Sequence, residues 1–504
     1  MSVAAPVDRR TARVDVPASG GSASSGGSVS RVGTASRGVT APWRLTLDAS
    51  LLLSAVVALV FFLPARAVVS GMGAAGRPHF ILAIGLLVWW LLCQLHPRLR
   101  VRSLHPLVVL VLVYVGWLTL AWAAGYDRGL TAGESSGSDR AMIANFAYLG
   151  VVLVAATGLT SRRRIDVVLR TVVAGAAFSA VFGWIQFFAN RDLTVWLMLP
   201  GFEANQPLVG ISARGADQFA RVAGTAGHYI EFGVVCAMVL PVAVHYARSR
   251  PAGMGKLAWL AVVLIGGAVP FSLSRSAIVA FALSAAVMLI GWPRRTRWNA
   301  IGALLLAVPV YMVVKPGLLG TLKSLFLNAA TDPSITGRTN DYATVWRYIV
   351  QRPWAGRGPG TFTPEQYILL DNQWLLSLVE TGWVGVAILA TIFIASIRVL
   401  LNVRRRARLI GDERLADLAL SLVAIVVTVP VTAAFFDAFS FTTATTVLWL
   451  TVGVAAALST QQRRRLAVLG IPVLTVPQRW RALVDVARGR PVDDPAGHGS
   501  VGWI

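Results

Sequence analysis

Long apolar runs recur between residues 47 and 460, and they restrict what the chain can fold into more than any other feature. Most hold about 18 residues or more, enough for a helix to cross a hydrocarbon core of about 30 Å. In lipid a helix satisfies its own backbone groups, which a lone strand cannot do. We therefore predict an all-α polytopic membrane protein with about twelve transmembrane helices, at 47–69, 78–95, 104–124, 141–160, 166–189, 228–246, 257–274, 276–292, 299–314, 374–397, 415–435 and 441–460.

Composition supports this fold class and separates a membrane domain from two tails. Hydrophobic residues make up 56% of the 504-residue chain and charged residues only 14%, whereas about 25% is usual in soluble domains. Residues 1–44 are rich in Gly, Ser and Arg and lack the apolar core of a signal peptide. We expect 1–44 to be a disordered cytoplasmic tail, 45–460 the transmembrane domain and 461–504 a second cytoplasmic tail.

The basic residues give the predicted helices an orientation. Every second connection is arginine-rich, as in "HPRLRVR", "SRRR", "NVRRRARLIGDER" and "QQRRR", whereas the others are nearly neutral. Short basic loops are typical of the cytoplasmic side. We therefore expect the protein to lie in the cytoplasmic (inner) membrane with both termini in the cytoplasm. The net charge of +23 then needs no nucleic-acid partner, because these arginines are spread over many loops.

Two segments on the opposite side, 190–227 and 315–373, are too long to be simple connectors. We expect both to be extracytoplasmic. The second contains "TGRTNDYATVWRYIVQRP", whose apolar positions have helical spacing and predict a short amphipathic helix. The Gly/Pro-rich stretch "WAGRGPGTF" that follows is typical of a loop.

Three arginines on the predicted outer side are candidate ligands for a diphosphate: Arg221, Arg275 and Arg338. A guanidinium binds phosphate oxygens in a bidentate manner and does not lose its charge. The alternative is that each extends to lipid headgroups or water. Arg275 lies in "FSLSRSAIVAF", between two spans with almost no loop, so this alternative is weakest there.

A histidine and a carboxylate near the start of the sixth span form a second candidate group. His228 and Glu231 are three residues apart and lie on one helical face. A carboxylate that orients an imidazole makes it a stronger general base. The alternative is a histidine with ordinary interfacial contacts.

Polar residues also interrupt the apolar stretch "YILLDNQWLLSLVETGW", residues 367–383. Asp371, Asn372 and Gln373 precede the tenth span, and Asp371 is either a catalytic group or a helix N-cap. Glu380 falls inside the span, where a carboxylate is costly unless it is paired or lines a wet cavity. Asp437, between the last two spans, is a weaker candidate.

Four stretches in this order resemble the O-antigen ligase and Wzy-type polymerase superfamily, over roughly residues 205–400. They are "RVAGTAGHYIEFG", "SLSRSAIVAF", "GRTNDYATVWRYIVQRPWAGRGPGTF" and "DNQWLLSLVETGWVG". The resemblance implies a glycosyltransferase of the outer face, which moves a glycan from an undecaprenyl-diphosphate carrier to an acceptor hydroxyl without a metal or other cofactor. It implies that Arg221, Arg275 and Arg338 bind the donor phosphates and that Asp371, beside Asn372, is the general base.

The chain departs from the ligase pattern at one position that bears on its acceptor. Ligases of the superfamily have His where this chain has Asp371. A glycan or glycolipid acceptor is therefore expected without a choice between ligase and polymerase, and envelope-polysaccharide assembly proteins are candidate partners. A transporter or a flippase for carrier-linked glycan is the alternative, since twelve spans with both ends inside suit many transporters.

Overall fold

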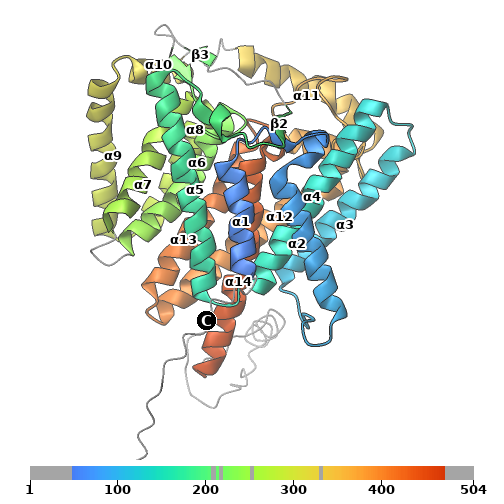
Figure 1. Ribbon diagram of the computed structural model, residues 1–504, viewed down its shortest axis with the longest axis horizontal. Helices are drawn as coiled ribbons and strands as arrows, with labels where there is room; N and C mark the ends of the chain where they lie inside the picture. Colours follow the sequence, from blue (N-terminus) through green and yellow to red (C-terminus); the bar gives the residue numbers. More distant parts are fainter. Residues whose placement is uncertain (1–47, 206–211, 215–218, 250–254, 328–332, 471–504) are drawn as a thin grey trace, which may run out of the picture. The chain divides into compact units, whose positions relative to one another are not determined.

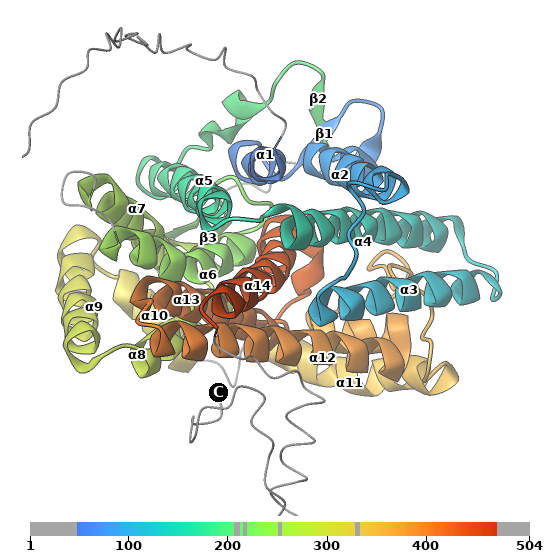
Figure 2. The same cartoon turned by 90° about the horizontal axis from the view of Figure 1, so that it is seen from below.

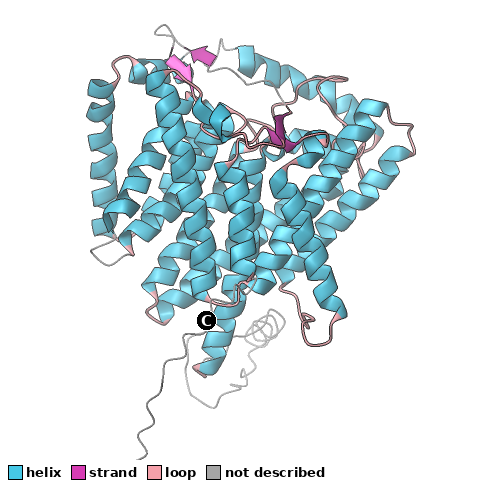
Figure 3. Cartoon of the chain, viewed as in Figure 1, coloured by secondary structure: helices cyan, strands magenta, loops and turns pink. Residues whose placement is uncertain are grey.

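The computed structural model describes residues 48–205, 212–214, 219–249, 255–327 and 333–470. Within this part of the chain the structure is almost entirely helical, with a few short strands (Figure 3). The α-helices are α1 (Ala49–Phe62), α2 (Pro78–Leu95), α3 (Pro106–Tyr126), α4 (Ala132–Gly158), α5 (Arg162–Ala189), α6 (Tyr229–Arg248), α7 (Gly255–Ala268), α8 (Arg275–Gly291), α9 (Arg294–Val314), α10 (Leu318–Leu327), α11 (Pro333–Gln351), α12 (Gln373–Leu409), α13 (Glu413–Thr432) and α14 (Thr442–Val468).

The helices confirm the predicted fold class. In the described part of the chain, ten helical stretches are long and apolar enough to cross a membrane, and α1 and α8 are shorter apolar helices. Each of these twelve falls on one of the predicted spans, and they lie side by side (Figure 1). The chain is a multi-pass membrane protein.

Several predicted boundaries differ from the structure, including the end of α12 at Leu409 instead of 397, and two of the differences have a clear local cause. The first helix ends at Phe62, not at 69, because Pro64 forces the preceding Leu63 into an extended conformation. The fourth helix begins at Ala132, nine residues earlier than predicted. A capping box satisfies its first turn: Glu134 N donates to Thr131 Oγ1 (3.2 Å), and Thr131 N donates to Glu134 Oε2 (3.0 Å).

The last helix lies at the centre of the packing. α14 packs against α4, α12 and α13, and all residues of its most apolar 18-residue window are buried. Viewed along the helices, it is surrounded by the earlier ones (Figure 2). Its small residues allow this close packing: a Cβ added at Gly453 would lie 2.7 Å from Ala155 Cβ on α4.

Strands β2 (Phe202–Ala204), β3 (Ser212–Arg214) and β4 (Phe219–Arg221) and the helices α10 and α11 occupy the predicted extracytoplasmic segments, while β1 (Ala67–Val69) follows α1 where the first span was predicted to continue. β1 pairs with β2, and β3 pairs with β4, both antiparallel. α11 confirms the predicted amphipathic helix and lies at the same end of the bundle as the strands (Figure 3). Its Val345 and Ile349 are buried against Val379 of α12.

Candidate functional site

Gly224 and Thr225 fix the segment that carries Arg221 and His228. Gly224 has φ +56, and a Cβ there would lie 2.6 Å from the Ser179 carbonyl of α5. Thr225 Oγ1 donates to the Phe61 carbonyl of α1 (2.8 Å). Strand β4 and the start of α6 are therefore held against α1 and α5, which places Arg221 and His228 at the same end of the bundle.

Arg275 is held by a tight turn between α7 and α8. The 3₁₀ helix η4 (Val269–Ser272) leads to Leu273, a buried residue in the left-handed region (φ 45). Ser274 Oγ then accepts from Ala277 N (3.5 Å) and caps α8, whose first residue is Arg275. The expected hairpin with almost no loop is confirmed, and its non-glycine left-handed residue is a local source of strain.

A glycine on α6 brings this hairpin against the His228 segment. A Cβ at Gly233 would lie 2.5 Å from both Ser272 Oγ and Ala277 Cβ, so only glycine permits the approach. On the other side of the hairpin, Val222 N donates to the Phe271 carbonyl (3.4 Å). The elements that carry Arg221, His228 and Arg275 are thus packed together.

Asp371 is not the N-cap of α12. Asn372 has this role: its Oδ1 accepts from Leu375 N (3.1 Å), and its Nδ2 donates to Tyr342 Oη of α11 (3.1 Å). The capping alternative for Asp371 is therefore wrong, because the neighbouring amide already occupies that position.

Gln373 connects the start of α12 to the turn between α13 and α14. Its backbone N donates to the Ala433 carbonyl (2.8 Å), and its Oε1 accepts from Phe439 N (2.8 Å). This turn contains Asp437, which lies near enough to Asp371 for the two carboxylates to interact. The structure therefore brings together two carboxylates that are 66 positions apart in the chain.

His228 lies near a positive and a negative group that both influence its imidazole. Burial lowers the pKa of its imidazole below the usual value, the positive charge of Arg221 lowers it further, and Asp371 opposes them. Arg221 in turn lies over the Tyr229 ring (4.6 Å) and donates to its hydroxyl (2.8 Å). His228 Nδ1 accepts from Ile230 N (3.2 Å), so the neutral ring carries its proton on Nε2.

Burial raises the pKa of the Asp437 carboxyl to about 6, and the negative charges of Asp371 and Glu231 act in the same direction. A hydrogen bond from Ser440 opposes them. Like-charged carboxylates at one site take different protonation states. Asp437 thus holds a proton at mildly acidic pH.

Glu231 does not orient the His228 ring. Its carboxylate is 1% exposed and accepts from Gly227 N (2.9 Å) and from Thr443 N at the start of α14 (2.7 Å). It therefore joins α6 to α14 and occupies the positive end of the α14 dipole. The expected carboxylate–imidazole pair is not formed, because both oxygens are used by backbone donors.

Glu380 anchors the Gly-rich loop. α12 is broken at Gly382 (φ 67), and Trp383 N donates to the Pro353 carbonyl (2.8 Å) instead of to Val379. The released Val379 carbonyl accepts from Arg357 N (2.9 Å). The Glu380 carboxylate accepts from Phe362 N (3.4 Å) in the same loop.

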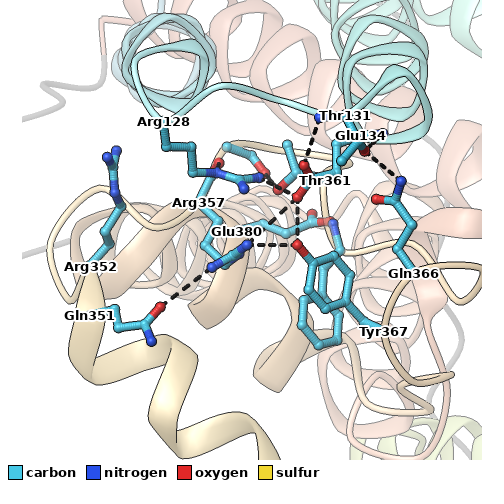
Figure 4. Close-up of polar contacts among 12 residues, drawn as sticks. Arg128, Thr131, Glu134, Gln351, Arg352, Arg357, Thr361, Gln366, Tyr367 and Glu380 are labelled. Atoms are coloured by element: carbon cyan, nitrogen blue, oxygen red, sulfur yellow. Dashed lines mark hydrogen bonds and ion pairs between the residues drawn. The ribbon is translucent and has the colours of Figure 1, made fainter.

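A second polar network fixes the other side of this loop (Figure 4). Glu134, 2% exposed, accepts from Arg128 (2.6 Å) and from the Tyr367 hydroxyl (2.6 Å). Arg357 donates to the same hydroxyl (2.7 Å), and its guanidinium lies 5.1 and 5.2 Å from the centroids of the Tyr348 and Tyr367 rings. The loop that leads to Asp371 is therefore held between α4 and α12.

Comparison with known protein families bears on this end of the bundle. Residues 260–390 match the family model described as O-antigen ligase. The chain carries an O-antigen ligase domain. No match to a curated protein was found.

The O-antigen ligase domain runs from α7 through the break in α12, within the region predicted from the resemblance. It includes Arg275 and Asp371, whereas Arg221 and His228 lie before it. Arg338 is on α11 inside the domain, and its side chain lies outside the described residues. The domain places this membrane protein among glycan ligases and polymerases.

Sequence reasoning missed two sets of groups around the domain. Arg77 precedes the proline that opens α2 and interacts electrostatically with Glu231. The position of Arg77 on the predicted outer side, directly before a span, could have marked it as a candidate site residue. Glu134 was not chosen because it lies in a predicted loop, and Arg357 was not chosen because it lies in a glycine-rich stretch. The spacing of Thr131 and Glu134 is nevertheless that of a capping box.

Proposed function

We propose that the protein is a membrane glycan transferase that moves a saccharide from an undecaprenyl-diphosphate carrier to an acceptor hydroxyl at the outer face of the cytoplasmic membrane, in envelope or exopolysaccharide synthesis. The observation that carries this proposal is that Arg221 and Asp371, from separate segments of the chain, both lie near enough to His228 to act on its charge. It puts an anion-binding group and a proton acceptor at one end of the bundle, beside the O-antigen ligase domain.

The arginines bind the donor. Arg221 is presented by β4 and oriented by Tyr229, and Arg275 is presented by the rigid α7–α8 turn. Both guanidinium groups stabilise the negative charge that develops on the diphosphate when the bond from the anomeric carbon to its oxygen breaks. Arg338 on α11 is a third donor ligand in this proposal.

Asp371 is the general base. The acceptor hydroxyl gives its proton to the Asp371 carboxylate, and its oxygen forms the new bond to the anomeric carbon as the carrier diphosphate leaves. His228 acts as a hydrogen-bond donor through Nε2, because its Nδ1 is occupied by Ile230 N. Asn372, Gln373 and Glu380 position the base and the loop that precedes it, while Glu231 holds the start of α14.

The proposed orientation places both termini in the cytoplasm. It is supported by the arginine-rich connections after α2, α4 and α12, which lie at the end of the bundle opposite to His228 (Figure 1). The donor then meets the site from the outer leaflet.

The test is a reaction of the purified protein with a synthetic polyprenyl-diphosphate saccharide and a saccharide acceptor, followed by mass spectrometry. We expect a transferred product with the wild type and a loss of at least about 100-fold with Asp371→Asn or Arg275→Ala. Glu365→Gln and Arg191→Ala, which change exposed residues of the same charges, are the matched controls.

The same variants are then tested in cells from which the gene has been deleted. Transfer predicts that Asp371→Asn cells accumulate carrier-linked glycan on the outer leaflet. Unchanged glycan profiles together with altered uptake of a solute would contradict transfer and favour a transporter. Accumulation of the donor on the inner leaflet alone would favour a flippase.

A further inference from the structure

A pocket of about 350 Å³ opens at the arginine-rich end of the helices, opposite to His228. It is formed by the connection between α2 and α3, the first residues of α3, and the last turns of α4 and α14. None of the residues that form the O-antigen ligase domain lines it. Nothing in the proposed transfer reaction uses it.

The rim of the pocket is strongly positive. Arg100, Arg102 and Arg464 line it, and no acidic residue does. Their side chains form no hydrogen bond or ion pair with the part of the chain that the structure describes. Two other arginines at this end, Arg164 and Arg465, are paired with Asp48 and Asp412 (3.0 and 2.7 Å). Three arginines without such a pair therefore line the pocket.

The interior of the pocket is uncharged and combines polar groups with apolar ones such as Val108 and Leu159. His105 Nε2 is 3.1 Å from Ser459 Oγ, and its Nδ1 accepts from Leu107 N (3.2 Å). Burial and the charge of Arg463 lower the pKa of His105 to about 4, so the ring is neutral at physiological pH. Thr160 and Gln461 add further hydrogen-bonding groups. Neutral groups surrounded by guanidinium groups suit a phosphate ester.

Exposed leucines precede the pocket-lining residues in the chain. Leu92, Leu95 and Leu99, on and just after the last turn of α2, are 58%, 80% and 59% exposed, and Leu99 also lines the pocket. A free phosphate would gain nothing from contact with these leucines. A lipid would, because its acyl chains pack against exposed leucines while its headgroup enters the polar space.

We propose that this pocket binds the phosphate headgroup of an anionic phospholipid from the leaflet at the arginine-rich end, with the acyl chains along the last turns of α2. Basic pockets between transmembrane helices are suited to such headgroups. The site is independent of the glycan-transfer proposal, since it lies at the other end of the helices.

Native mass spectrometry of the purified full-length chain tests the proposal. Phosphatidylglycerol and phosphatidylcholine with the same acyl chains are titrated into the detergent solution. We expect the anionic lipid to remain bound at a defined stoichiometry and the zwitterionic lipid to dissociate. The combined variant Arg100→Gln, Arg102→Gln and Arg464→Gln should weaken binding by roughly fivefold per arginine, or about 100-fold in total.

The matched control removes three exposed arginines at the same end that do not line the pocket: Arg163→Gln, Arg294→Gln and Arg405→Gln. It should bind as the wild type does. A second test keeps the arginines and adds a carboxylate, through Ser103→Glu on the exposed lining. This variant should weaken binding of the anionic lipid by about fivefold or more.

Three outcomes would overturn the proposal. The first is an equal loss of anionic-lipid binding in the control and pocket variants, which would mean unspecific attraction to basic loops. The second is equal retention of the two lipids. The third is a rise in the unfolding midpoint with inorganic phosphate that matches the rise with phosphatidylglycerol, which would make the pocket a site for free phosphate.

Discussion

Asn372 caps α12 by accepting a hydrogen bond from Leu375 N (3.1 Å), and the adjacent Asp371 is thereby left for another role. The two residues can be separated by experiment. Asn372→Ala should lower the free energy of unfolding by about 1 kcal/mol, because one helix N–H loses its partner. Asp371→Asn should leave the unfolding midpoint nearly unchanged and reduce glycan transfer by about 100-fold or more. Thermal unfolding and product formation are measured on both. Equal transfer by Asp371→Asn and wild type would remove Asp371 as the base.

Arg221 is expected to act through the shape of its guanidinium and not only through its charge. Arg221→Lys keeps the charge but loses the bidentate geometry, so we expect roughly tenfold weaker use of the donor. Arg191→Lys, the same change at an exposed arginine outside the proposed site, is the matched control. Initial rates at several donor concentrations distinguish the two. A lysine variant with wild-type rates would indicate that Arg221 faces solvent or lipid.

Glu231 should matter for stability. Glu231→Gln retains one oxygen, so one of the two backbone donors, Gly227 N or Thr443 N, loses its acceptor. We expect a loss of about 1–3 kcal/mol in the free energy of unfolding. The measurement is the unfolding midpoint in detergent. A variant with an unchanged midpoint and no activity would instead support the catalytic role that the sequence suggested.

The loop before Asp371 should depend on close contact between two glycines. Gly360 has φ +71, and a Cβ there would overlap the Gly137 carbonyl of α4. Gly360→Ala should therefore release the loop and increase its cleavage by an added protease several-fold. Gly302→Ala on α9, where a Cβ meets no atom within 4 Å, is the control and should cleave as the wild type does. No change in Gly360→Ala would mean that α4 does not hold the loop.

Asp437 should make stability depend on pH. Its pKa is raised from an ordinary value near 3.8 to about 6 by burial. The folded state then binds a proton that the unfolded state has lost, so the contribution is complete below pH 4 and is lost as the pH rises through about 6. Asp437→Asn should flatten the decline of the free energy of unfolding between pH 4 and 7, by of the order of 1–3 kcal/mol. Parallel profiles for the two proteins would contradict this assignment.

The positions of the helices could be predicted because each span must be apolar along its own length. What limits such a prediction is visible in α4, where "TAGESSGSDR" is polar yet helical. The capping box and the burial of Glu134 under Arg128 stabilise it. The sequence contains the capping-box pattern, but it does not show that Glu134 pairs with Arg128.

The site was predicted in part for the same reason. Arg275 in its tight turn follows from local sequence, and so does a polar group before α12. The contact of Glu231 with Thr443 joins positions 212 apart, and that of Glu380 with Phe362 depends on how the loop folds back on α12. Spacing along the chain carries no information on either, so a carboxylate that seemed available for catalysis proved to be bound to backbone.

The central position of α14 has a consequence for how the molecule is made. Helices enter the membrane in the order of synthesis, and α14 is the last of them, yet it forms the wall against which α4, α12 and α13 pack. Until Thr442–Val468 has left the ribosome and inserted, the faces of α4, α12 and α13 that pack on it have no partner, although these helices can already pack on their other neighbours. The last described span therefore completes the transmembrane domain from the inside, and a nascent chain that stops just before it lacks the centre of its packing.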